Sequence, residues 1–263
     1  QVEATRAFLT ADGLDADSVL VAGENGIIMR WDGDARSLIS NGSSENRLAL
    51  AGSGSKDVWA VGDEVLHDQG SGWQVVDPKT PRALYDVAAV GADDAWAVGT
   101  GGTVLHWKGK VTGFEPVEVK SLAWLRGIAV NGTGGWIVGE KGTLFAMING
   151  TSWIATPSNT SADLNDVWIT SGSDAWAVGA NGTLMHWDGA AWGPYPISSE
   201  AGPVPTLRAV WGAGAKDVWA VGLNGTVARY DGSVWTVTRS GELYSLNDIW
   251  GSSASVPSGN HFA

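Results

Sequence analysis

Three histidines are the residues of this chain with the clearest capacity for proton transfer or metal binding. His67, His106 and His186 stand at the same place in three similar stretches, LHDQ, LHWK and MHWD. A shared metal site would require the three imidazoles to converge from separate parts of the fold. We therefore expect each histidine to pack within its own repeat.

A second candidate is the segment DGLDADS at 12–18, in which Asp12, Asp15 and Asp17 offer carboxylate oxygens to Ca²⁺. The segment lacks the complete ligand run of an EF-hand loop. Ca²⁺ is the one cofactor that the sequence suggests, and no other cofactor is expected.

The elements that position these residues repeat along the chain. The large apolar residue of one hexapeptide recurs at spacings of 39, 37, 40, 40 and 43 residues. This is the length of a four-stranded blade. The six copies are SVLVAG at 18–23, DVWAVG at 57–62, DAWAVG at 94–99, GGWIVG at 134–139, DAWAVG at 174–179 and DVWAVG at 217–222.

Other strands flank each hexapeptide. An apolar stretch such as LNDVWITS at 164–171 precedes it, and a turn such as Asn181-Gly182 follows it. Asn-Gly tolerates the positive φ that a type I′ turn requires at both central residues. A third strand and a Gly-x-x-Trp turn into a fourth strand complete the unit. Four short antiparallel strands cannot bury both faces of their sheet alone, so the sequence predicts an all-β fold, a β-propeller of four-stranded antiparallel blades.

The turn WDGAAW at 187–192, with YDGSVW at 230–235 and WDGDAR at 31–36, resembles the Asp-box turn of bacterial neuraminidase repeats and related propellers. Here His186 or Arg229 precedes the motif where those families carry Ser or Thr, and the Gly directly follows the Asp. The resemblance implies a propeller fold and no activity.

We expect one propeller domain over 1–263, with six blades favoured. The segment 246–251 would supply the innermost strand of blade 1, beside 18–23, and thus close the ring. The alternative is a seven-bladed propeller with an incomplete last blade. The expected blades are 14–40, 46–78, 84–119, 122–157, 164–196 and 207–239, with the closing strand 246–251.

Fifteen of the 16 tryptophans recur in phase with the repeat and are expected to fill the core between blades. Trp59 and Trp219 should be equivalent core residues of blades 2 and 6. Trp124, in the connection between blades 3 and 4, is out of phase. It is a candidate platform for a sugar or another flat ligand.

Polar residues at the start of the first strands should gather at one mouth of the channel, where they could hydrogen-bond a polyol or a peptide. Because Asp recurs in phase, local capping is an equal explanation. The long loop at 193–205 adds one further aromatic candidate. The candidate ligand-binding residues are thus Trp124, Tyr85, Asp86, Arg126, Asn165, Asp166, Tyr195, Arg208, Asn247 and Asp248.

The formal net charge of −12 disfavours nucleic acid and anionic membrane surfaces as partners. No apolar run is long enough to span a bilayer, so no membrane insertion is expected. The first residue, Gln1, suggests a processed N-terminus, which fits an extracellular, cell-surface or periplasmic protein. The sequence indicates no oligomeric state.

These observations favour a non-catalytic recognition module of a secreted or surface protein, which binds a glycan or another surface ligand through its loops. A first alternative is a protein-protein interaction scaffold or a structural domain of a larger surface protein. A second, which the neuraminidase-like resemblance would imply if it extended to activity, is a sialidase-like enzyme acting on glycosides. Its relevant residues would be Arg126 and Arg208, with Arg6 or Arg82 as further arginines, and Tyr85 with Asp86. No acid/base constellation stands outside the repeat, so we expect no enzyme.

Overall fold

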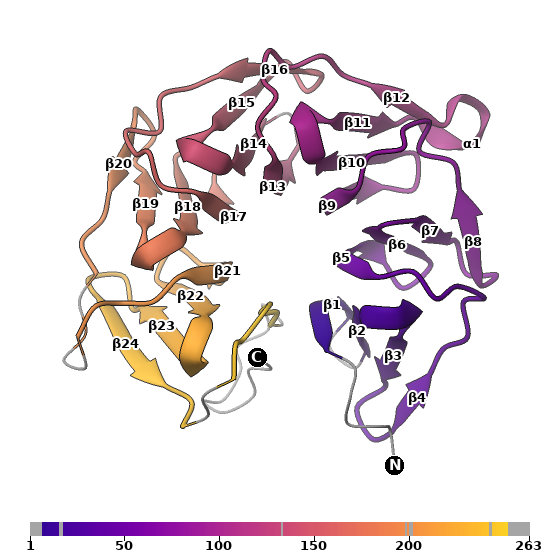
Figure 1. Ribbon diagram of the computed structural model, residues 1–263, viewed down its shortest axis with the longest axis horizontal. Coiled ribbons are helices and arrows are strands. Elements are labelled where there is room, and N and C mark those ends of the chain that lie inside the picture. The colour runs from indigo at the N-terminus through magenta and orange to yellow at the C-terminus, as the bar shows by residue number, and fades with distance from the viewer. Residues whose placement is uncertain are drawn as a thin grey trace. The chain divides into compact units, whose positions relative to one another are not determined.

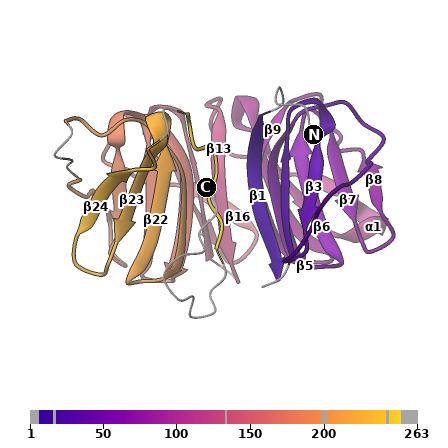
Figure 2. The same cartoon turned by 90° about the horizontal axis from the view of Figure 1, so that it is seen from below.

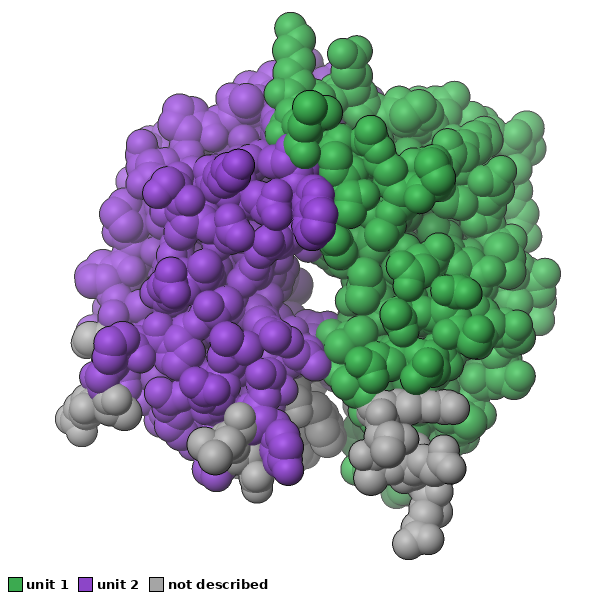
Figure 3. Space-filling view, in the orientation of Figure 1, with its two compact units in different colours: residues 1–122 green, residues 123–263 purple. Residues whose placement is uncertain are grey.

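The computed structural model describes residues 7–15, 18–132, 134–197, 199, 202–241 and 244–251. It divides into two compact units, 1–122 and 123–263 (Figure 3). Within the described residues each unit contains three four-stranded antiparallel sheets (Figure 1). The expected all-β propeller fold with six blades is therefore confirmed. No helix among the described residues is long and apolar enough to cross a membrane.

Unit 1 holds blades 1 to 3, and its strands pair in chain order within each blade. The first strands of consecutive blades contact one another. Blade 1 contains β1 (Phe8–Asp15), β2 (Ser18–Gly23), β3 (Ile28–Trp31) and β4 (Arg36–Leu38); blade 2 contains β5 (Arg47–Gly54), β6 (Asp57–Gly62), β7 (Val65–Asp68) and β8 (Trp73–Val76); blade 3 contains β9 (Leu84–Gly91), β10 (Asp94–Gly99), β11 (Val104–Trp107), α1 (Gly109–Thr112) and β12 (Phe114–Pro116).

Unit 2 holds blades 4 to 6, built in the same way, and Figure 2 shows β22, β23 and β24 of blade 6 side by side. Blade 4 contains β13 (Leu125–Asn131), β14 (Gly134–Gly139), β15 (Leu144–Ile148) and β16 (Ser152–Ala155); blade 5 contains β17 (Leu164–Ser171), β18 (Asp174–Gly179), β19 (Leu184–Trp187) and β20 (Trp192–Pro194); blade 6 contains β21 (Leu207–Gly214), β22 (Asp217–Gly222), β23 (Thr226–Tyr230) and β24 (Trp235–Arg239).

Most second strands lead into the third through a short 3₁₀ turn whose central residue has positive φ. Asn181 and Gly182, for example, have φ of 53° and 69°. Asn and Gly tolerate this left-handed conformation at low cost, which confirms the expected turn chemistry. Blade 2 lacks this turn and joins β6 to β7 through Asp63 and Glu64 alone. The turns are η1 (Glu24–Gly26), η2 (Thr100–Gly102), η3 (Glu140–Gly142), η4 (Ala180–Gly182) and η5 (Leu223–Gly225).

Indoles fill the cores of both units. Trp59 is fully buried and packs edge to face against Trp107 and Phe114 of the next blade, with ring centroids 5.0 and 5.4 Å away. Such contacts add to the free energy gained by burying the large apolar area. Trp219 holds the same strand position in blade 6 but is only partly buried, and the guanidinium carbon of Arg229 lies 4.9 Å from its ring centroid. The expected equivalence of these two indoles therefore holds for strand position and not for burial.

The first strand of blade 1 comes from the N-terminal segment. β1 pairs with one edge of β2 and β3 pairs with the other, so the expectation that 246–251 lies beside 18–23 is wrong. The sequence of β1, FLTADGLD, lacks the Leu-x-Asp-Val spelling of β9 and β17. It compensates through side chains, because Thr10 and Asp12 accept hydrogen bonds from the N–H groups of Leu50 and Gly52 in β5, at 3.0 and 2.7 Å.

The segment 246–251 lies against blade 6 within unit 2. The Leu246 N–H donates to the Gly222 carbonyl oxygen at 3.0 Å, and buried Ile249 packs with Trp211 and Val221. Its sequence LNDIWG repeats the spelling of β17, which begins LNDVW. The segment therefore continues the repeat beyond blade 6, and blade 1 is complete without it.

Candidate functional site

One backbone position before each first strand is held the same way in all six described blades. The carbonyl oxygen of this pre-strand residue accepts a hydrogen bond from the residue after the second strand's final Gly; Glu140 N–H, for example, donates to Trp124 O at 3.0 Å. A Cβ on that Gly would lie 2.1 to 2.3 Å from the same oxygen, which explains why each hexapeptide ends in Gly. The pre-strand residues are Ala7, Asn46, Ala83, Trp124, Asp163 and Thr206.

A β-bulge follows at the second residue of every first strand, where the pairing register shifts by one residue. A bulge re-aims the side chain of the extra residue. Four of the predicted site residues stand at this position. The bulge residues are Leu9, Leu48, Tyr85, Arg126, Asn165 and Arg208.

A third position is the residue after the hexapeptide Gly, which we call the turn residue. The turn residues are Glu24, Asp63, Thr100, Glu140, Ala180 and Leu223. Pre-strand, bulge and turn residues thus share a fixed backbone and differ in side chain from blade to blade. We call these three positions together the variable face.

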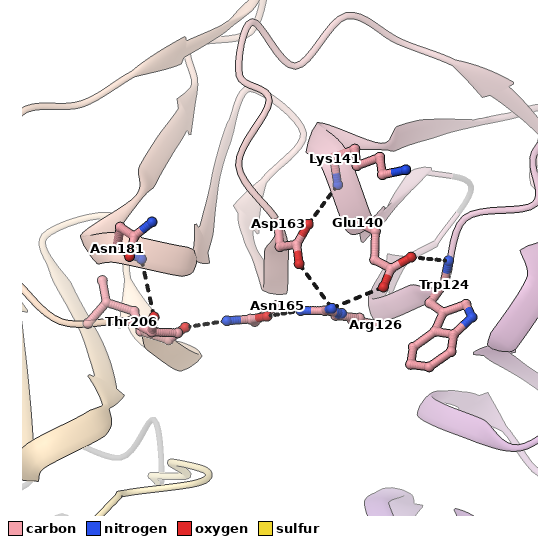
Figure 4. A network of polar contacts seen from close by, with 9 residues as sticks. Trp124, Arg126, Glu140, Lys141, Asp163, Asn165, Asn181 and Thr206 are labelled. Atoms are coloured by element: carbon pink, nitrogen blue, oxygen red, sulfur yellow. Dashed lines mark hydrogen bonds and ion pairs between the residues drawn. The ribbon is translucent and has the colours of Figure 1, made fainter.

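In unit 2 the variable face contains a network centred on Arg126 (Figure 4). Its Nη1 donates to Asn165 Oδ1 at 2.9 Å, while Nη2 lies 3.3 Å from Glu140 Oε1 and 3.1 Å from Asp163 Oδ2. Asn165 in turn donates from Nδ2 to the Leu207 carbonyl oxygen at 2.7 Å. The network therefore crosses blades 4, 5 and 6.

Trp124 is held at the edge of this network. Its N–H donates to Glu140 Oε2 at 3.3 Å, and its carbonyl accepts from Glu140 N–H, so one glutamate fixes both sides of its peptide backbone. The side chain nevertheless remains 46% exposed. Lys141, at the tip of the adjacent turn, donates its backbone N–H to Asp163 Oδ1 at 2.9 Å while its side chain extends away from Arg126 (Figure 4).

The structure thus groups Trp124, Arg126 and Asn165 and adds Glu140, Lys141 and Asp163, which were not predicted. Their signal in the sequence was their fixed distance from the hexapeptide Gly or from the first-strand Leu. Trp124 belongs to this pattern, since it holds the same place as Asp163 and Thr206. The expectation that it lies outside the repeat is therefore wrong.

Arg208 and Asn247 meet at the next junction of unit 2, where Arg208 Nη1 donates to Asn247 Oδ1. Arg208 is exposed. Arg126 and Asn165 make the same contact two repeats earlier. Tyr85 is partly buried in blade 3, within unit 1, and ligand contact by it stays a prediction.

Three aspartates share the third position of a Leu-x-Asp spelling and accept hydrogen bonds from backbone N–H groups. Asp86, Asp166 and Asp248 each accept a hydrogen bond through Oδ1 from the N–H of the next residue, at 2.7 to 2.8 Å. Asp166 also accepts one through Oδ2 from Val210 of blade 6, at 2.8 Å. Burial raises the pKa of Asp166 to about 7, helped by the negative charge of Asp248. These carboxylates brace the strands, and ligand contact by them stays a prediction.

Tyr195 is built into blade packing at the start of the long loop. Its ring lies 5.0 Å from that of Trp176 and 5.9 Å from that of Tyr230, and its hydroxyl donates to the Ser233 carbonyl oxygen at 3.1 Å. These contacts tie blade 5 to blade 6. Its role in ligand binding also stays a prediction.

Of the three carboxylates suggested for Ca²⁺, the structure gives a contact for that of Asp12. Asp12 accepts the hydrogen bond from Gly52, Asp15 is the last residue of β1, and Asp17 lies outside the described residues. Among the residues that the structure describes, no group of three or more acids or histidines is placed to hold a metal ion.

The histidines pack within their own blades, as expected. His67, His106 and His186 each donate through Nε2 to the Asp that opens the hexapeptide and stack on the Trp of the same hexapeptide. The rings of His106 and Trp96, for example, have centroids 3.8 Å apart, and Nε2 lies 2.8 Å from Asp94 Oδ1. These His–Asp pairs serve strand packing.

The aspartate of the WDGAAW turn also has a structural role. Asp188 Oδ1 accepts hydrogen bonds from Ala190 and Ala191 N–H, both at 2.9 Å, and these bonds lower the pKa of its carboxyl group. Asp32 and Asp231 make the same turn in blades 1 and 6. The motif therefore closes the turn between third and fourth strands.

No family model and no curated protein matches this sequence. Among solved structures, YCF48 bound to D1 peptide aligns with TM-score 0.70 and 19% identity over 90% of this chain and 82% of that one. YCF48 from Cyanidioschyzon merolae aligns with TM-score 0.70 and 15% identity over 90% of this chain and 87% of that one. The WD40 propeller domain of Doa1 aligns with TM-score 0.77 and 11% identity over 95% of this chain and 88% of that one.

The resemblance to neuraminidase repeats is not confirmed by these similarities. At such low sequence identity these similarities show the architecture and establish neither a ligand nor a reaction. What the structure and its neighbours establish together is the fold: this chain is a six-bladed β-propeller, similar to the YCF48 and WD40 propellers.

Proposed function

We propose that this chain is a protein-interaction module that binds a polypeptide segment across the variable face of blades 4 to 6. The observation that carries the proposal is Trp124, an exposed indole whose backbone is fixed on both sides by Glu140. A large aromatic side chain on a rigid backbone loses little entropy on binding, so it can contribute strongly to affinity.

The construction of the variable face supports recognition. Backbone hydrogen bonds hold the pre-strand position in every described blade, while the side chains there range from Ala83 to Trp124 and Asp163. Function is commonly placed on such variable positions of a rigid scaffold. Near Trp124 the face offers an apolar surface, amide groups and charges of both signs, which together suit a polypeptide.

The similar structures support this class of ligand over a glycan. The YCF48 structure holds a D1 peptide, so a propeller of this architecture accommodates a polypeptide. Doa1 and RRP9 carry WD40 propellers of comparable similarity. We therefore propose the interaction scaffold in place of the glycan-binding module that the sequence favoured.

The test is selection of a random peptide library on the full chain, followed by fluorescence polarisation with each selected peptide. Trp124→Ala should weaken binding about tenfold or more, the usual cost of removing an aromatic hot spot. Ile154→Ala is the matched control, since Ile154 lies on β16 of the same blade and is 47% exposed. It should leave affinity unchanged.

Failure to select any peptide, or equal affinity for wild type and Trp124→Ala, would contradict the proposal. A glycan array probed in parallel should give no signal that depends on Trp124. Such a signal would favour the glycan-binding module instead.

A further inference from the structure

Arg126 and Arg208 occupy the same place in the repeat but differ in their charged surroundings. Both are bulge residues, in β13 and β21, and each donates through Nη1 to the Oδ1 atom of an asparagine in the following repeat. Arg126 is also paired with two carboxylates, those of Glu140 and Asp163.

The positions that supply these carboxylates are uncharged around Arg208. Glu140 is the turn residue of its blade, and the corresponding residue of blade 6 is Leu223. Asp163 directly precedes the next repeat's Leu164, and the corresponding residue before Leu246 is Ser245. Arg208 is exposed and forms no ion pair with any carboxylate of the described residues.

We propose that Arg208 binds a carboxylate of the polypeptide partner, in the place that Glu140 and Asp163 hold around Arg126. The Arg126 network demonstrates that this backbone geometry admits two carboxylates beside a bulge guanidinium. Guanidinium and carboxylate groups match in shape and charge, so the pair adds specificity as well as affinity. This inference rests on the proposed function and names the chemistry of its ligand.

The charge of the whole chain limits what the ligand is. With a net charge of −12, the protein repels a long acidic segment. The favoured ligand is therefore a segment with one well-placed carboxylate, either an Asp or Glu side chain or the peptide's own C-terminus.

The experiment uses peptides selected on the wild-type chain, resynthesised with each carboxylate replaced singly by an amide, including the C-terminal one. One replacement should weaken binding to wild type about tenfold, and the same replacement should not weaken binding to Arg208→Gln. The replacement that shows this effect identifies the source of the carboxylate.

Two further variants sharpen the result. Arg229→Gln is the matched control, because Arg229 is an exposed arginine of the same blade that is already paired with Asp217 at 2.9 Å. It should leave the effect of amide replacement intact. Leu223→Glu gives blade 6 the glutamate that blade 4 has at the same position, Glu140. This variant should therefore bind the carboxylate-bearing peptide more weakly and bind its amide form with unchanged affinity.

The possible failures are distinguishable. If no peptide binds, or if Trp124→Ala leaves the peptide affinity unchanged, the proposed function is wrong. If peptides bind through Trp124 but each amide replacement affects wild type and Arg208→Gln equally, the proposed function stands and the Arg208 inference is overturned.

Discussion

His67 Nε2 lies 2.6 Å from Asp57 Oδ1, and the His67 ring stacks on that of Trp59 with centroids 3.6 Å apart. Burial lowers the pKa of His67 although Asp57 opposes the shift. Because the folded-state pKa lies below the unfolded value of about 6.5, the unfolded chain binds more protons. His67 should therefore cost stability as the pH falls below about 6.5 and leave it unaffected above.

An NMR titration of the His67 imidazole measures this directly. The expected midpoint lies below 6.5, with a matching loss of unfolding free energy in acid that His67→Gln reduces. A midpoint above 6.5 would mean that the Asp57 charge dominates over burial.

Trp59→Ala should destabilise the protein by about 3–5 kcal/mol, because a fully buried indole leaves a large cavity. Urea unfolding measures the change. Trp219→Ala, at the same strand position but partly buried, should cost clearly less. Equal costs would show that the two indoles are energetically equivalent after all.

Asp166 should have the opposite pH dependence to His67. Its pKa of about 7 in the folded state lies above the usual 3.8, so the folded chain binds more protons between these values. The stability it contributes is full below about 3.8 and is lost as the pH rises through about 7. Carbon-detected NMR of the Asp166 carboxyl group tests this, and a midpoint near 4 would contradict it.

Arg47 replaces the first-strand leucine in the one blade whose turn is short. Its guanidinium is fully buried and lies 2.9 Å from Glu64 Oε2. Glu64→Ala should destabilise by about 3 kcal/mol, because a buried charge loses its partner. Adding Arg47→Leu should recover part of that loss in chemical denaturation, whereas no recovery would show that the guanidinium contributes mainly by filling space.

The sequence repeat predicted the fold well because its recurring residues are the ones that the backbone conformation requires. The hexapeptide Gly is dictated by the approach of the pre-strand carbonyl, and the Asn-Gly turns by their left-handed conformation. The first strand of blade 1 escaped prediction because β1 lacks the opening leucine of β9, β13, β17 and β21 and bonds to β5 through the side chains of Thr10 and Asp12.

The candidate site was only partly predictable. Arg126 and Asn165 were found from their phase, but their partners Glu140 and Asp163 come from a turn and from the next repeat. Such contacts depend on how a bulge aims a side chain, which spacing in the sequence does not reveal.

A structure of the full chain with a selected peptide tests peptide binding at the variable face of blades 4 to 6 most directly. We expect the peptide to cover the indole of Trp124 and to cross the variable face of these blades. A peptide seated on the fourth strands, with Trp124 as exposed as the 46% seen without it, would overturn the proposed function.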